Sequence, residues 1–203
     1  MKTESGPKRG PGRRPGGPDT RGEILTAARD EFAARGFDGT TMRAVASSAG
    51  VDAALVHHYF GGKDDLFLAA LEIPVDPRVV IPEMLRPGID GIGERLVRMF
   101  VSVWDDPESR KPLLAVFRSA LSSEAGADLI RGGMMRMVFE QVAEGLGVPD
   151  PVLRAQLVGS QMTGLVMMRY VLRVEPIASM PPDQLVQWLG PTIQRYLSGS
   201  PVS

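Results

Sequence analysis

Apolar side chains recur at spacings of three and four residues along most of this chain, and this periodicity constrains the fold more than any other feature. The clearest amphipathic stretch repeats its apolar positions as Ile92, Leu96, Met99, Phe100, Val103 and Trp104. Stretches with the same periodicity cover residues 113–121, 129–146, 151–174 and 182–197. No segment alternates apolar and polar residues as a half-buried strand does, so the sequence predicts an all-α fold.

Glycine and proline dominate the start of the chain. Residues 1–19 hold too little apolar surface to fold, and we expect a disordered basic arm there. Residues 1–22 carry six basic and two acidic side chains, while the whole chain has a formal net charge of -1. A basic arm on a mildly acidic body is typical of a protein that approaches a polyanion from one end. A tail that only aids solubility is the alternative.

Several classes of chemistry are excluded by composition. The chain contains no cysteine, which rules out disulfides and thiolate metal sites. Its two histidines, His57 and His58, are adjacent, and neighbouring helix residues point about 100° apart, so they cannot share one metal ion. We therefore expect no enzyme activity, no metal and no cofactor. No apolar run reaches the ~18 residues that span a bilayer, and no signal peptide is evident, so we expect a cytoplasmic protein without a membrane partner.

Four short helices are predicted within residues 20–72. Glycines follow the first three apolar stretches, at Gly36, Gly50 and Gly61-Gly62. The middle pair, Thr41–Ala49 and Asp52–Tyr59, has the proportions of a helix-turn-helix, whose second helix enters the major groove of DNA. Many helical proteins contain such a pair joined by glycine, so the spacing alone does not establish DNA binding.

The residues in and around this helix pair are more specific. Segments 36–46 (GFDGTTMRAVA), 49–51 (AGV) and 56–66 (VHHYFGGKDDL) closely resemble the DNA-binding signature of the TetR (tetracycline repressor) family. The resemblance covers roughly residues 20–71. It implies a helix-turn-helix DNA-binding domain at 20–72 and a helical ligand-sensing and dimerisation domain at 73–203.

The resemblance also implies roles for individual residues. Thr41 and Arg43 would contact phosphate or a base edge, His58 and Tyr59 would bond phosphates, and Lys63 would meet a phosphate at a helix N-terminus. The full set of expected DNA-binding residues is Thr41, Arg43, Asp52, Ala53, Leu55, His57, His58, Tyr59 and Lys63. The recognition helix departs from the commonest family pattern at residues 53–55 and 57, and offers few hydrogen-bonding groups. Ala53 or Leu55 would then read bases by touching a thymine methyl.

Two local alternatives stay open in this segment. Of the neighbouring aromatic residues Tyr59 and Phe60, we expect Phe60 to be buried. The run from Lys63 to Asp65 is also compatible with a solvated helix start that neutralises its own charge.

The second domain is expected to hold a pocket for a hydrophobic or aromatic ligand. Methionine is flexible and polarisable, which suits a cavity for variable apolar shapes, and methionines cluster in two of the predicted helices. The expected ligand-binding residues are Phe100, Trp104, Phe117, Met134, Met137, Met162, Met167 and Tyr170. A methionine-rich core is the alternative. Arg118, Arg136 and Arg169 would either meet an acidic group or lie in solvent and ion pairs.

A homodimer interface is predicted on the last two helices. Small residues from Gly159 to Gly164 would allow close helix contact, and the last helix offers a second apolar face. The expected interface residues are Leu157, Ser160, Gly164, Leu185, Trp188, Leu189 and Ile193. Packing within one chain is the alternative. Gly190-Pro191 is expected to kink or split the last helix.

Taken with the resemblance, these observations predict a dimeric repressor that binds double-stranded, palindromic operator DNA and is released by a small-molecule inducer. A transcriptional activator or a ligand-independent repressor of the same fold is the first alternative. A helical binding or interaction protein that does not bind DNA is a more distant one.

Overall fold

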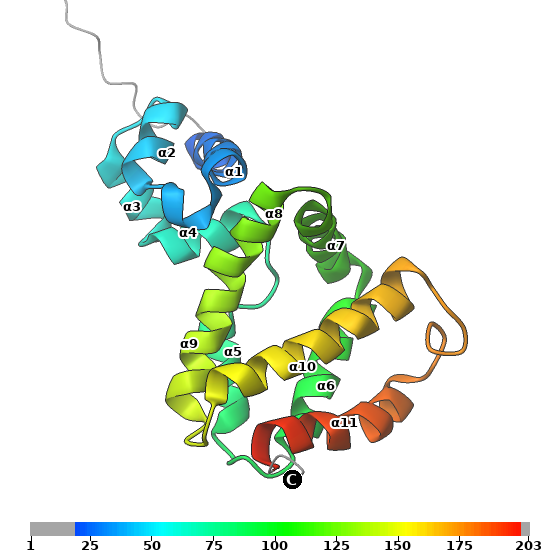
Figure 1. The fold of residues 1–203 in the computed structure, drawn as a ribbon. Coiled ribbons are helices and arrows are strands. Elements are labelled where there is room, and N and C mark those ends of the chain that lie inside the picture. The colour runs from blue at the N-terminus through cyan, green and yellow to red at the C-terminus, as the bar shows by residue number, and fades with distance from the viewer. Residues whose placement is uncertain (1–18, 200–203) are drawn as a thin grey trace, which may run out of the picture.

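The computed structural model describes residues 19–199, and within this range the chain is built from helices, with no strand (Figure 1). In chain order the elements are α1 (Thr20–Gly39), α2 (Met42–Ala49), α3 (Ala53–Phe60), α4 (Lys63–Ala70), α5 (Pro77–Leu85), α6 (Ile92–Asp105), α7 (Pro107–Ser122), α8 (Glu124–Leu129), the π-helical η1 (Ile130–Met135), α9 (Arg136–Gly145), α10 (Pro151–Leu165), the π-helical η2 (Val166–Val171) and α11 (Pro182–Ser198). The predicted all-α fold is confirmed. The predicted basic arm, apart from Asp19, lies outside the described residues.

Helices α1 to α4 form a small domain around an aromatic centre. Phe37 stacks on Phe32 with ring centroids 5.9 Å apart, and the ring of Phe67 meets both edge-on at 5.1 and 5.3 Å. Gly36, where the sequence predicts the end of the first helix, has a φ of 67° and breaks the helical path inside α1. Glycine tolerates this left-handed φ, and the break lets Phe37 join the core.

The second domain is built on a close pair of helices, α6 and α11, with α10 packed on α11 and α9 (Figure 1). Its core comes mainly from these helices, and Val97, Leu185 and Ile193 are almost wholly buried in it. A smaller cluster joins Trp104, Val166 and Tyr170. Within residues 19–199, no helix is both long enough and apolar enough to cross a membrane.

The structure adds a π-helical turn to one predicted long helix and shows no split at the proline of another. The segment predicted as one helix at 129–146 contains the π-helical turn η1, where Gly133 lies against the tip of the Phe67 ring on α4. A side chain at Gly133 would collide with that ring, so this close contact between the two domains requires a glycine. Pro191, in contrast, lies inside α11 without splitting it. Packing against α6 supports the helix on both sides of the proline.

Candidate functional site

The ends of α2 and α3 are set by the residues that the sequence analysis picked out. The hydroxyl oxygen of Thr41 accepts a hydrogen bond from the Ala44 N–H at 3.1 Å and caps α2. Gly50 ends that helix with a φ of 67°. A carboxylate oxygen of Asp52 accepts from the Ala54 N–H at 2.8 Å and caps α3. The two capped helices and the short turn between them therefore form a compact helix-turn-helix.

Buried residues fix which faces of these helices point outward. Val45 and Ala46 of α2 and Val56 and Phe60 of α3 are buried in the domain core. The hydroxyl of Thr40, just before α2, lies 2.8 Å from the Gly36 carbonyl oxygen and ties α2 to α1. The opposite edge of α2 and α3 is left open to solvent, as a helix that enters a DNA groove requires.

The expected DNA-binding residues divide into two groups. The exposed group, at the open edge, is Thr41, Arg43, Asp52, His57, His58 and Tyr59. The partly buried group is Ala53, Leu55 and Lys63, of which Ala53 packs against the domain core. Phe60 is 6% exposed and Tyr59 is 40% exposed, so the expectation that Phe60 is the buried one is confirmed.

Lys63 makes contacts that the sequence does not indicate. Its ammonium lies 4.4 Å from the centre of the Phe37 ring and donates to the Asp38 carbonyl oxygen at 3.3 Å. Burial lowers the pKa of Lys63, and nearby Arg136 lowers it further, while Asp38 acts in the opposite direction. The lysine therefore fastens the start of α4 to the end of α1, and its contact with phosphate stays a proposal.

The charge of this domain is unusual for a DNA-binding surface. Residues 20–72 include five basic and eight acidic side chains, and Arg43 is the only lysine or arginine between residues 36 and 62. Phosphate contacts supply most of the affinity of DNA-binding proteins, so this domain offers few cations for that purpose.

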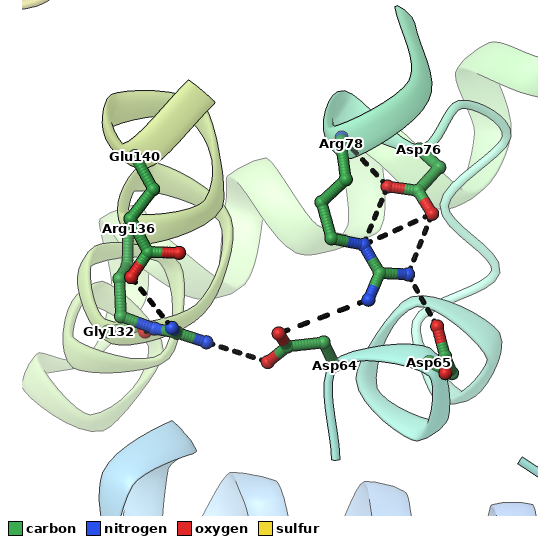
Figure 2. A network of polar contacts seen from close by, with 7 residues as sticks. All are labelled: Asp64, Asp65, Asp76, Arg78, Gly132, Arg136 and Glu140. Carbon is green, nitrogen blue, oxygen red and sulfur yellow. Dashed lines mark hydrogen bonds and ion pairs between the residues drawn. The ribbon is translucent and has the colours of Figure 1, made fainter. Parts of the chain in front are cut away.

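A network of ion pairs joins the α1–α4 domain to the second domain (Figure 2). Arg136 of α9 donates to a carboxylate oxygen of Asp64 on α4 at 2.6 Å and to Glu140 at 2.9 Å. Arg78 of α5 lies 3.9 Å from the other oxygen of Asp64. The carboxylate of Asp64 therefore lies between two arginines of the second domain.

Arg78 extends the network to two further carboxylates, Asp65 on α4 and Asp76 just before α5 (Figure 2). The hydrogen bond from the Arg78 guanidinium lowers the pKa of Asp76, and the same bond raises the pKa of Arg78. Together these contacts hold the start of α4 against both α5 and α9.

An open cavity of about 970 Å³ lies beside this junction. One wall is residues 34–38 at the end of α1, and the other comes from α8, η1 and α9, with Val152 of α10. Arg136 and Glu140 line it, so the cavity borders the ion-pair network directly. It contains none of the eight residues that the sequence analysis expects around a ligand.

Seven of those eight residues are divided among three apolar clusters, which corrects the expectation of one shared pocket. Met137 is fully buried in the core of the DNA-binding domain, with Met134 packed beside it, because η1 and α9 lean on α1. Met162 lies in the core of the second domain. Trp104 and Tyr170 stack on each other, with Phe100 and Phe117 packed against them. Met167 is half-buried in η2.

The expected dimer residues also separate. Leu185 and Ile193 are 1% and 0% exposed because they pack in the protomer's own core. The expectation that these two residues form part of a dimer interface is therefore wrong. Leu189 packs partly against the same core. Leu157, Ser160 and Gly164 of α10 and Trp188 of α11 are exposed.

Comparison with known families agrees with this two-domain division. A family model described as "Bacterial regulatory proteins, tetR family" matches residues 24–70, which span most of α1 to α4. A second, "Tetracyclin repressor-like, C-terminal domain", matches residues 90–197 and so more than half of the chain. The chain belongs to the TetR family. Members of the TetR family are transcriptional regulators rather than enzymes.

A solved TetR-family regulator from Streptomyces coelicolor A3 is 42% identical, with 93% of this chain and 99% of that one covered and a TM-score of 0.51. The HTH-type transcriptional regulator BetI of Brucella anthropi is 46% identical over 54 residues, 27% of this chain and 28% of BetI. The HTH-type transcriptional repressor AcnR of Corynebacterium glutamicum is 41% identical over 51 residues, 25% of this chain and 27% of AcnR. The chain thus matches only about a quarter of the length of these curated TetR-type relatives.

Proposed function

We propose that this chain is a transcriptional repressor that binds a palindromic operator as a homodimer and is released by a small molecule. The single observation that carries the proposal is the capped helix pair α2–α3, whose outer edge is open and bears Thr41, Arg43, His58 and Tyr59. The name of AcnR, a transcriptional repressor that is 41% identical over 51 residues, supports repression over activation. A repressor works where the chromosome lies, which places this one in the cytoplasm.

An exposed apolar stripe supports the dimer. Leu153 and Leu157 on α10 and Met168 and Leu172 at its C-terminal continuation are 38 to 59% exposed, and they recur at helical spacing. Trp188 of α11 is 74% exposed. An exposed apolar stripe is typical of a protein interface, and a two-fold axis would pair it with itself. Such a dimer would present two α3 helices to successive major grooves.

Selection of bound DNA from a random pool tests the proposal. We expect recovery of an inverted repeat, and a copy of that repeat near promoters in the source genome. A reporter driven by that promoter should fall in output when the chain is co-expressed. Recovery of no enriched sequence would contradict DNA recognition, and a rise in reporter output would contradict repression.

A further inference from the structure

The cavity between the end of α1 and the α8–α9 segment has the size of a small-molecule site. Its volume of about 970 Å³ lies at the upper end of the range for such sites, roughly 300–1,000 Å³. Apolar side chains form much of its lining: Ala34, Phe37, Ala125, Phe139, Ala143 and Val152. The cavity therefore suits a molecule with an apolar body.

The arginines that line the cavity differ in how they are paired. Arg35 pairs with Glu31 at 3.1 Å and Arg131 pairs with Asp128 at 3.0 Å, each within its own helical segment. Arg136 instead reaches across to the other domain. Its guanidinium makes one hydrogen bond each to Gly132, Glu140 and Asp64. Because a guanidinium has five N–H donors, two remain for a further acceptor.

A second observation points to an anion. The ammonium of Lys63 and the guanidinium of Arg136 both lie over the Phe37 ring, 4.4 and 5.0 Å from its centre. Burial is the main cause of the lowered pKa of Lys63, and repulsion from Arg136 adds to it, while Asp38 and Asp64 act in the opposite direction. A negative charge placed beside Arg136 would relieve that repulsion, and a carboxylate matches the planar guanidinium with two parallel hydrogen bonds.

We propose that this cavity binds small molecules with an apolar body and a carboxylate, held by Arg136, and that occupancy draws Arg136 away from Asp64. Loss of the Arg136–Asp64 pair removes one of the three arginine–carboxylate contacts that hold α4 against the second domain, and it is the one made by α9. Because α4 follows the recognition helix α3 after only two residues, freeing α4 loosens the position of α3. The expected outcome is weaker operator binding, and this part rests on the proposed function.

Calorimetry on the full chain tests the site without DNA. The probes are octanoate, octanol and octylamine, which share the apolar body and differ in the head group. We expect octanoate to bind wild type about tenfold or more tightly than the other two. R136Q should remove that preference while leaving octanol binding unchanged. The site is refuted if octanoate does not bind, or if R136Q binds octanoate as wild type does.

A second pair of variants shows whether the cavity itself is used. Ala143 lines the cavity, and Ala115 is an exposed alanine on α7 that does not. A143F should fill the space and abolish octanoate binding, whereas the matched variant A115F should bind as wild type does. Undiminished binding to A143F would place octanoate elsewhere and overturn the proposal.

Fluorescence anisotropy with the selected operator tests the link to α4. Octanoate should weaken operator binding by wild type, and D64N should bind the operator weakly even without octanoate. If octanoate binds in the calorimeter but leaves operator affinity unchanged, the link is refuted while the repressor proposal stands. If no DNA is bound at all, the proposed function fails, and the calorimetry still decides the site.

Discussion

Gly93 on α6 faces Gly190 on α11 at a point where the two helix backbones touch. A Cβ atom at Gly93 would collide with the Gly190 carbonyl oxygen and lie 2.6 Å from the backbone nitrogen of Gln194. The Gln194 side chain closes the contact, since it accepts from the Gly93 N–H at 3.0 Å and donates to the Ile89 carbonyl oxygen at 2.9 Å. The centre of the second domain therefore depends on the absence of side chains at two positions.

Gly93→Ala is expected to lower the free energy of unfolding by about 1–3 kcal/mol or more, because the colliding atoms are backbone and cannot turn aside. Urea denaturation measures the effect. Gly159→Ala is the matched control, since a Cβ at Gly159 meets nothing within 4 Å and alanine favours the helix by up to about 1 kcal/mol. Equal stability of the two variants would show that the α6–α11 contact is looser than described.

These glycines also show how far the sequence predicts the packing. The small residues at 159–164 are predicted to mark close helix contact between two chains. Gly159 and Gly164 meet no atom of their own chain, so that contact stays a prediction, whereas Gly93 and Gly190 mark a close contact within the chain that the sequence analysis did not single out. A glycine in an amphipathic helix indicates that another backbone can approach, but not which one. The caps at Thr41 and Asp52 are predictable because a cap acts within three residues of its helix.

The contacts of Asp64, in contrast, cannot be predicted from the sequence because its partner is far away along the chain. The sequence alone is compatible with Asp64 in a self-neutralised helix start, whereas its carboxylate pairs with Arg136, 72 residues further along the chain. No local pattern links two positions at that separation. The division of the methionines among separate cores follows from the same contact between η1–α9 and α1, which is a tertiary relationship.

The Arg136–Asp64 pair is expected to contribute only modestly to stability. Both side chains are about one-third exposed, so solvent screens their attraction. A double-mutant cycle of R136Q, D64N and the combined variant should give a coupling free energy of about 0.5–1 kcal/mol in urea denaturation. The coupling should shrink as salt is added. A coupling of zero at low salt would mean that the two side chains do not interact in solution.

Tyr59→Phe is expected to weaken operator binding by roughly tenfold, because it removes one hydrogen bond to a phosphate from the exposed edge of α3. The thermal midpoint should stay the same, since the ring keeps its contacts with His58 and Phe60. Tyr196→Phe on α11 is the matched control and should bind DNA as wild type does. Unchanged affinity of Tyr59→Phe would remove Tyr59 from the interface.

Removal of residues 1–18 is expected to weaken DNA binding and to flatten its dependence on salt. Lys8, Arg9, Arg13 and Arg14 lie in that segment, whereas residues 20–72 carry a net charge of -3. The slope of log affinity against log salt should fall by up to about 0.9 for each phosphate that the arm neutralises in the full chain. Anisotropy titrations across a salt series measure the slope. An unchanged slope would leave the arm without a role in DNA binding.

Leu157→Glu on α10 is expected to convert a dimer into monomers. Leu157 is 39% exposed and lies in the apolar stripe, so its substitution would place a charge where two copies meet. In a two-fold dimer the substitution is present in both subunits, so its effect on the free energy of association is doubled. A loss of about 1.4 kcal/mol of association free energy per subunit would weaken the dimer about a hundredfold. Sedimentation velocity over a concentration series measures this dissociation.

Leu121→Glu on α7 is the matched control for that experiment, because Leu121 is 65% exposed but lies outside the stripe. It should stay dimeric. The same pair of variants separates assembly from DNA binding. A monomer with an intact α3 can bind one half-site, but it loses the added affinity that a dimer gains by binding two half-sites at once. Leu157→Glu should therefore bind a single half-site as wild type does and bind the full palindrome much more weakly. If Leu157→Glu remains a dimer, the two-fold contact must lie on another face of the second domain.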